Sequence, residues 1–294
     1  MNTANNRILT RPNTALLNVT ELIKTSVKGI DRVKLAFDHP CPDIPLAAIQ
    51  RYCKGEIKPI VHSNSDGQKY HPERELYLDF HQPSIKALKQ LYRATQGRYK
   101  VTPYYLELAL DLIPYSSREC SDHAILIRDF ILGHMKVRHL SCLVTRYETS
   151  YYYSPRSIDG TQVSRNVVAY ADRPSKLWGS RSEDNCCHIE HRFYNGASIA
   201  NLGIHCLGDL VHFQFNNFWS GNFNLFDLLS KTKIPTLLEP ETIELSGTAL
   251  RNRATAILMT AEVDGVFVLQ NLIRRYPNLI PHLTPMRNAS LILA

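Results

Sequence analysis

Two segments of the chain, residues 104–111 and 187–193, alternate apolar residues with ionisable ones. Residues two apart share one face of a β-strand, so this alternation gathers the ionisable side chains on a single face of each segment. The residues that share a face in this way are Glu107 and Asp111 in the first segment and His188, Glu190 and Arg192 in the second. Burying so many charges in a sheet is costly unless a bound group compensates them.

A divalent cation would compensate these charges, because carboxylate oxygens and a neutral imidazole are suitable ligands for Mg²⁺ or Mn²⁺. The sequence therefore makes Glu107, Asp111, His188 and Glu190 candidate metal ligands. The alternative is that both rows face solvent on an antiparallel sheet, whose outer face is normally polar.

The segment Cys186-Cys187-His188-x-x-His191 offers a second set of candidate metal ligands, for zinc. Adjacent cysteines rarely chelate one ion well, and the paired spacing of a zinc finger is missing. The seven cysteines of the chain are odd in number and scattered, which favours reduced thiols over a disulfide framework.

The elements that would position these residues follow one another as strands and helices. Alternation predicts strands over residues 30–37, 75–80, 104–113, 151–154, 166–171 and 186–194. Helical spacing predicts a helix after Pro83, with an apolar stripe that includes Ile85, Leu88 and Leu91, and a second helix over residues 122–135. The order β-α-β-α-β-β-β predicts an α+β fold, with helices packed on one face of a largely antiparallel sheet.

The domain organisation that we expect has three parts. Residues 1–28 have weak periodicity and form a loosely held leader, with order beginning near Gly29 and a loop at residues 63–68. Residues 29–234 form the α+β domain, which includes short helices at 198–202 and 207–211. Residues 242–294 form a helical subdomain, which Asp264-Gly265 could divide into two helices.

The charge balance of the 294-residue chain is moderately basic, with a net charge of +7 and a pI near 9.0. This excess suits a polyanionic partner such as DNA, and the fifteen tyrosines could stack on unpaired bases. Lys86, Lys89 and Arg93 line one side of the helix after Pro83 and are candidate phosphate contacts, although a solvated helix face is the simpler interpretation. The sequence shows neither a signal peptide nor a membrane span, which predicts a cytoplasmic protein.

The order of four motifs resembles the rolling-circle replication initiators and relaxases of plasmids, filamentous phages and integrative elements. Motifs of that family run R-I-D-L-A-x-D, L-Y-x-G-S-R, a strand ending in Y-x-K, and R-x-E-x-E-L. The corresponding segments here are Tyr-Leu-Glu-Leu-Ala-Leu-Asp at 105–111, Tyr-Tyr-Tyr-Ser-Pro-Arg at 151–156, Asn-Val-Val-Ala-Tyr-Ala-Asp at 166–172, and His-Ile-Glu-His-Arg at 188–192. The match covers roughly residues 104–219 and implies an HUH/Rep-like core.

The resemblance also implies a site and a reaction. In such proteins acidic residues of the first and last motifs hold a divalent metal, and a tyrosine attacks a DNA phosphodiester to leave a covalent 5′-phosphotyrosine. Glu107 and Asp111 take the positions of the two aspartates of the first motif, and His188 and Glu190 take those of the paired acids of the last. The metal would be Mg²⁺ or Mn²⁺.

Tyr194 is the first candidate nucleophile, because it lies just beyond the last acidic strand, and Tyr170 is the second, because it matches the tyrosine of the family's Y-x-K position. Arg156 and Arg192 are candidate bidentate phosphate contacts. The chain departs from the family in lacking a His-x-His strand and a Tyr-x-x-Lys helix, and Asp172 stands where the Lys after Tyr170 would be.

The function that follows is replication initiation for a mobile genetic element, by metal-dependent nicking of single-stranded or hairpin origin DNA. The resemblance implies DNA as the partner and host replication proteins as further partners, and it leaves the oligomeric state open. Two other functions remain open from the residues: a DNA-binding protein of the same fold without catalysis, and an interaction protein with a polar-faced sheet.

Overall fold

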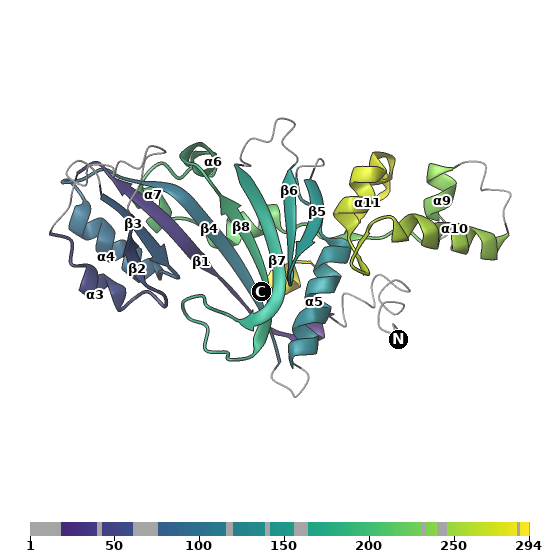
Figure 1. The fold of residues 1–294 in the computed structure, drawn as a ribbon, viewed down its shortest axis with the longest axis horizontal. Helices are drawn as coiled ribbons and strands as arrows, with labels where there is room; N and C mark the ends of the chain where they lie inside the picture. Colours follow the sequence, from purple (N-terminus) through teal and green to yellow (C-terminus); the bar gives the residue numbers. More distant parts are fainter. Residues whose placement is uncertain are drawn as a thin grey trace.

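The computed structural model describes residues 19–39, 43–60, 76–115, 120–138, 142–155, 164–230, 233–239, 246–286 and 289–293. Most of the expected leader, the expected loop at residues 63–68 and Arg156 therefore lie outside the described residues. The fold is α+β, with a large antiparallel sheet at its centre (Figure 1).

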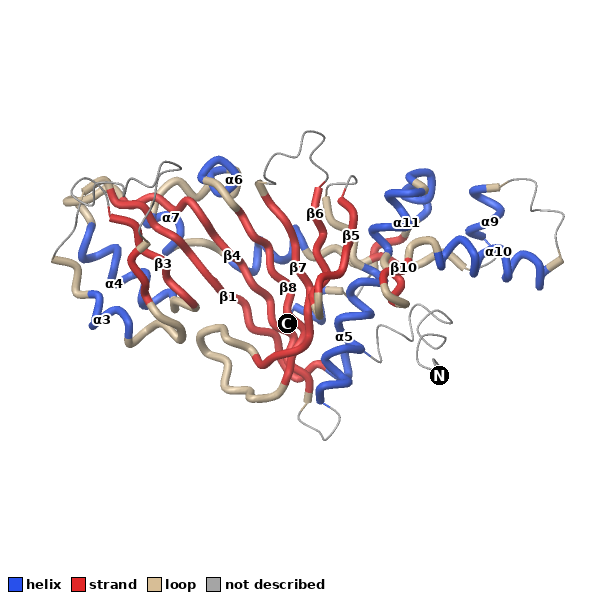
Figure 2. The backbone as a smooth tube through the Cα atoms, in the orientation of Figure 1, coloured by secondary structure: helices blue, strands red, loops and turns tan. Residues whose placement is uncertain are grey.

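The large sheet has eight strands in the order β2-β3-β1-β4-β8-β7-β6-β5, and every neighbouring pair is antiparallel. The strands are β1 (Ile23–Phe37), β2 (Ile57–Pro59), β3 (Leu76–His81), β4 (Val101–Pro114), β5 (Cys142–Tyr147), β6 (Ser150–Pro155), β7 (Arg165–Pro174) and β8 (Asn185–Phe193). The long strands β1 and β4 run side by side through the middle of the sheet (Figure 2). The prediction of a largely antiparallel sheet is confirmed.

Alternation in β4 separates the two faces of the sheet. Leu106, Leu108, Leu110 and Leu112 are fully buried and belong to the main hydrophobic core. The residues between them, which include Glu107 and Asp111, project from the opposite face, as expected from the period of two.

Helices pack against the face that carries these leucines. They are α3 (Leu46–Gln50), α4 (Ile85–Thr95), α5 (Cys120–His134), α6 (Gly196–Ala200), α7 (Leu207–Val211) and α8 (Phe215–Asn222). Side chains of all six, such as Leu88 and Trp219, share one hydrophobic cluster with the β4 leucines, which confirms that the helices pack on one face. Ser84 caps α4 by accepting a hydrogen bond from the backbone N–H of Ala87. The helix therefore begins two residues after Pro83, as the prediction of a helix after this proline requires.

Three strands of the large sheet, β1, β2 and β5, differ from the sequence-based expectation, and β2 was not expected at all. β1 begins at Ile23, so the expectation that order begins near Gly29 is wrong, and residues 23–28 pair with β4. β5 was not expected; it forms a hairpin with β6 in which Tyr147 pairs with Ser150 across a two-residue turn. Glu148 in that turn has a φ of 53°, a conformation more often supplied by Gly or Asn.

Several of the C-terminal elements build a second hydrophobic cluster, which includes Ile257, Leu269 and Leu272. The elements after α8 are β9 (Phe226–Asp227), α9 (Lys233–Leu238), α10 (Gly247–Met259), β10 (Glu262–Val263), β11 (Val266–Phe267), α11 (Leu269–Arg275), a 3₁₀ helix (Pro277–His282), β12 (Thr284–Pro285) and α12 (Ser290–Leu293). Asp264-Gly265 does separate two helices, through the turn of a small β10–β11 hairpin. Among the described residues, no helix is long and apolar enough to cross a membrane.

The chain end returns to the main core, because Ile292 of α12 belongs to the same cluster as the β4 leucines. The hydroxyl of Ser26 in β1 donates to the backbone carbonyl of Leu293. A separate helical subdomain at 242–294 stays a prediction.

Candidate functional site

A polar cleft of about 510 Å³ lies on the face of the sheet opposite the helical core. Its lining combines carboxylates, cations and tyrosines from the central strands. The lining residues are Asp31, Arg32, His81, Gln82, Tyr105, Glu107, Tyr147, Glu148, Ser150, Tyr152, Tyr170, Arg173, Lys176, Glu190, Arg192 and Tyr194. This mixture suits a ligand that carries negative charge and needs neutralisation in a partly buried place.

The register of β4 and β8 brings the two predicted motifs together. Glu107 pairs with Arg192, Ala109 with Glu190, and Asp111 with His188. Residues directly opposite in an antiparallel pair lie on the same face, so both motifs project into the open side of the sheet. The strands that carry Glu107 and Glu190 are therefore neighbours in one sheet.

Asp31 is a third acid at this place, and a β-bulge brings it there. Ile30 pairs with Leu108 and Arg32 pairs with Glu107, so β1 carries one extra residue between them. Because of this bulge, the consecutive residues Asp31 and Arg32 both line the cleft. One oxygen from each of the carboxylates of Asp31, Glu107 and Glu190 lies within 4.8 Å of the others, and we call these three residues the carboxylate cluster.

Gln82, the residue after β3, holds Asp31 in place. Its side-chain amide donates to the Asp31 carboxylate at 2.7 Å, and its backbone N–H donates to the Asp31 carbonyl, also at 2.7 Å. Gln82 has a φ of 44°, which is costly for a residue with a side chain. Gln82 thus orients the Asp31 carboxylate from a strained backbone conformation that its surroundings hold in place.

Burial and mutual repulsion set the electrostatics of the carboxylate cluster. Burial, together with the nearby charge of Glu190, raises the pKa of Glu107 to about 8. Burial also raises the pKa of Glu190, against the opposing effect of Arg192. The Arg192 guanidinium donates to Glu190 at 2.6 Å and lies 3.6 Å from a Glu107 oxygen, so one arginine is shared by two acids.

Two tyrosine hydroxyls donate directly to the carboxylate cluster. Tyr105 donates to Glu107 and Tyr170 donates to Glu190. Burial and the adjacent carboxylates raise the pKa of both phenols far above the usual value. These hydroxyls are therefore firmly protonated in the structure, with their protons directed at the acids.

Tyr194, the residue after β8, has a different environment. It is half-buried, and its hydroxyl contacts the side chains of Asn166 and Arg192. Burial raises its pKa, while the Arg192 charge and these hydrogen bonds act in the opposite direction. Its ring packs edge-on against Tyr105 with the centroids 5.6 Å apart, so Tyr194 lies next to the carboxylate cluster without donating to it.

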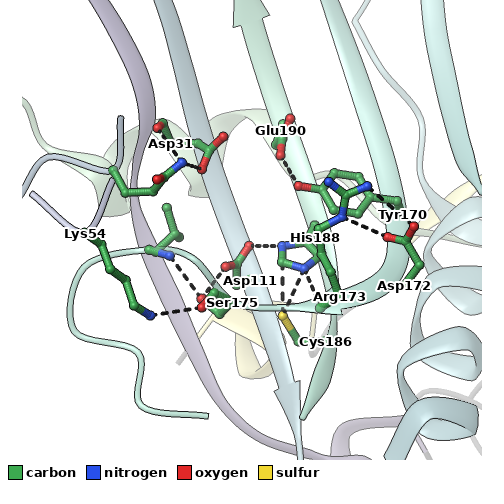
Figure 3. A network of polar contacts seen from close by, with 12 residues as sticks. Asp31, Lys54, Asp111, Tyr170, Asp172, Arg173, Ser175, Cys186, His188 and Glu190 are labelled. Atoms are coloured by element: carbon green, nitrogen blue, oxygen red, sulfur yellow. Dashed lines mark hydrogen bonds and ion pairs between the residues drawn. The ribbon is translucent and has the colours of Figure 1, made fainter. Parts of the chain in front are cut away.

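Asp111 and His188 lie deeper on the same face and form a second cluster with Cys186 (Figure 3). His188 Nδ1 is 2.8 Å from the Asp111 carboxylate, and Nε2 is 2.9 Å from the carbonyl oxygen of Arg173. Both partners are acceptors, so both ring nitrogens carry protons and His188 is an imidazolium. Burial alone would lower the pKa of His188, but the Asp111 charge and these hydrogen bonds raise it.

The four predicted metal ligands are thus divided between two groups. Glu107 and Glu190 lie in the carboxylate cluster with Asp31, whereas Asp111 and His188 bond to each other. The four-residue zinc reading is wrong, because Cys187 and His191 project into the helical core. There His191 packs against Phe218 and Trp219.

The predicted DNA contacts that the structure describes lie in two separate places, the surface of α4 and the cleft. Lys86, Lys89 and Arg93 are exposed on α4, and the Lys86 ammonium lies 4.2 Å from the centre of the Tyr52 ring. Arg192 lies in the cleft. Sequence reasoning missed Asp31, Arg32, Tyr105, Arg173 and Lys176, and the missed residues of β1 had no local signal because a bulge places them.

Comparisons with known proteins give distant structural likeness alone. No family model matches the chain, and a search of curated proteins found no match. Among solved structures, the chain is similar to a rolling-circle replication initiator protein from Geobacillus stearothermophilus. The two are 10% identical, the alignment covers 68% of this chain and 87% of that chain, and the TM-score is 0.30. The function of the chain therefore has to follow from the residues of the cleft.

Proposed function

We propose that the protein binds single-stranded or hairpin DNA in the polar cleft and cleaves one phosphodiester with a tyrosine, aided by a divalent cation. The observation that carries the proposal is the convergence of Asp31, Glu107 and Glu190 beside tyrosine hydroxyls, in a cleft also lined by arginines. Initiating replication of a mobile element is the biological role that such a reaction serves.

The carboxylate cluster suits Mg²⁺ or Mn²⁺, because its donors are three hard oxygens. The raised pKa of Glu107 supports this fit, since it reports acids crowded together that a cation would relieve. A bound divalent cation would polarise the scissile phosphate and offset charge that develops on it. Asp111 and His188 are not ligands in this proposal, because both His188 nitrogens are already engaged.

Cationic side chains of the cleft would orient the phosphates on either side of the cleaved bond. Arg32 is held by Asp79, to which its guanidinium donates from two nitrogens. Arg173 is exposed, with its guanidinium 4.7 Å from the centre of the Tyr170 ring. Together with Lys176 these groups surround the carboxylate cluster with positive charge.

Tyr194 is the nucleophile that we propose, with Tyr170 as the alternative. An attacking phenol must lose its proton; burial raises the pKa of Tyr194, but the Arg192 charge beside it favours the loss. The carboxylate beside Tyr170 disfavours it. In the reaction the tyrosine oxygen bonds to phosphorus and the bond from phosphorus to the 3′ oxygen breaks. The phenolic proton leaves to water and the 3′ oxygen takes a proton from water, so the products are a 5′-phosphotyrosine and a free 3′-hydroxyl.

The test is incubation with Mn²⁺ and a labelled single strand that contains the origin of the replicon carrying the gene. Wild-type protein should give a labelled adduct that survives denaturation, and Tyr194→Phe should abolish it. Tyr152→Phe, a matched change at another tyrosine of the cleft, should retain it. An adduct that persists in Tyr194→Phe and disappears in Tyr170→Phe would move the assignment to Tyr170. Cleavage without any adduct would refute a tyrosine nucleophile.

A DNA-binding protein without catalysis is the second candidate function, and the position of Arg192 favours it. This guanidinium already lies between Glu190 and Glu107 and compensates part of their charge. DNA binding by wild-type protein without cleavage of the origin strand would establish this second function over the first.

A further inference from the structure

Two aromatic rings are in contact outside the lining of the cleft, one exposed and one half-buried. Trp178, in the loop between β7 and β8, is 43% exposed. Tyr52, in the turn after α3, packs against it with the ring centroids 6.5 Å apart and the planes tilted by 59°. We call Trp178 and Tyr52 the aromatic platform.

The loop that carries Trp178 is anchored on both sides of the indole. Before it, the Ser175 hydroxyl donates to Asp111 at 2.5 Å, and the buried Leu177 lies over Gly29. The ammonium of Lys54 donates to the carbonyl of Ser175 at 3.1 Å (Figure 3). It also donates to the carbonyl of Ser180 at 3.0 Å, which ties the loop on both sides of Trp178 to the turn that follows Tyr52. The indole is therefore presented from a fixed base.

The aromatic platform connects two basic regions of the surface. Lys176, two residues before Trp178, lines the cleft. On the other side, the Lys86 ammonium lies over the Tyr52 ring, and Lys89 and Arg93 continue along the exposed side of α4. A path of positive charge interrupted by flat rings thus runs from the cleft to α4.

We propose that the aromatic platform binds the single strand that flanks the cleaved phosphodiester, by stacking unpaired bases on Trp178 and Tyr52 while α4 contacts the phosphates. This inference rests on the proposed function, because it names the path of the same DNA beyond the cleft. Aromatic stacking tolerates any base, whereas a paired base presents no free face to a ring. The platform therefore selects for single strands without selecting for sequence.

Tryptophan fluorescence tests the contact directly, because the chain has two tryptophans. Trp219 is fully buried in the helical core, so a bound oligonucleotide reaches only Trp178. Adding single-stranded oligothymidine of 20 nucleotides should quench the emission of wild-type protein. Trp178→Phe, which leaves Trp219 as the single tryptophan, should remove the quenching. Equal quenching in Trp178→Phe would overturn the proposal.

Affinity gives a second readout. Trp178→Ala and Tyr52→Ala should each weaken binding of the oligothymidine by on the order of tenfold. Tyr115→Ala, at a tyrosine that is 54% exposed after the end of β4, is the matched control and should bind as wild type does. The melting temperature of each variant verifies that it is folded.

The two proposals fail in different ways. If wild-type protein forms the adduct on its origin strand and Trp178→Ala binds single strands as tightly as wild type, the platform is refuted and the proposed function stands. If the platform variants lose affinity but no adduct forms, the platform stands and the chemistry fails. If wild-type protein binds no single-stranded DNA at low salt, both proposals are refuted.

Discussion

At the scale of single residues, the chemistry of the cleft depends on how Glu107 is charged. A pKa of about 8 means that, without a cation, this carboxyl holds a proton over much of the neutral range. In the unfolded chain the Glu107 carboxyl has a pKa near 4.3, so it has lost that proton at neutral pH. The native state thus binds a proton that the unfolded state does not, and its stability falls as the pH rises from about 4.3 towards 8.

A divalent cation should reverse this loss, because it replaces the proton of Glu107. We expect Mn²⁺ to raise the melting temperature of the protein, and the rise should grow between pH 6 and pH 8. At a concentration 100 times its dissociation constant, Mn²⁺ should add about 2.7 kcal/mol to the free energy of unfolding. Differential scanning fluorimetry across this pH range provides the measurement.

Charge-neutral variants separate specific binding from a general salt effect. Asp31→Asn and Glu190→Gln should each abolish most of the Mn²⁺-dependent rise. Glu148→Gln, at an exposed acid of the same cleft outside the carboxylate cluster, should keep it. A rise that survives in Asp31→Asn would place the cation elsewhere.

At the scale of elements, the sequence was sufficient to predict which side chains share a face and insufficient to predict their partners. Alternation alone places Glu107 and Asp111 on the open face of β4. The partner of each depends on the register between strands: Asp111 lies opposite His188 and bonds to it, so these two do not join Glu107. Register depends on how two strands pair, so it cannot be predicted from the pattern of either strand alone.

The bulge at Asp31 and the hairpin before β6 have the same explanation. Residues 30–37 read as a regular strand, because the extra residue is visible only against β4. β5 was missed because its turn uses Glu148 and Thr149, where a sequence pattern would need Asn-Gly or Gly to indicate a hairpin. In both places tertiary pairing overrides the local pattern.

Removing one partner of the Asp111–His188 contact between β4 and β8 should lower the free energy of unfolding. Asp111→Leu leaves the buried His188 without its counter-charge and Ser175 without its acceptor. We expect a loss of about 3 kcal/mol in the free energy of unfolding, measured by urea denaturation. Asp172→Leu removes an exposed acid paired with Arg173 and should cost less than about 1 kcal/mol. Equal costs for the two variants would show that the buried pair contributes no more than a surface pair.

At the scale of the whole molecule, the sheet divides the protein into a helical side that is apolar and an open side that is charged. The composition predicted a polyanionic partner, and the fold adds a cleft lined by Arg32, Arg173, Lys176 and Arg192 on the open side. The helix after Pro83 was predictable from its apolar stripe, which reports burial against one sheet face. By contrast, α3 and α8 were not expected from the sequence.

Salt dependence should report how many phosphates the basic surface contacts. Affinity for single-stranded DNA should fall as salt rises, with a log–log slope of about −0.7 for each neutralised phosphate. Replacing Lys86, Lys89 and Arg93 together by Gln should make the slope shallower by about 2. Arg251→Gln, at an exposed arginine of α10, should leave the slope unchanged. Binding that does not respond to salt would instead favour an interaction protein.

The bulge in β1 also determines how easily this site can be lost by deletion. Ile30 lies opposite Leu108 on the core face, and Arg32 lies opposite Glu107 on the open face. Deleting Asp31 would therefore give regular pairing with β4, while Ile30 stays in the core and Gly29 stays beneath Leu177. A descendant could thus discard this acid by a single deletion and still fold.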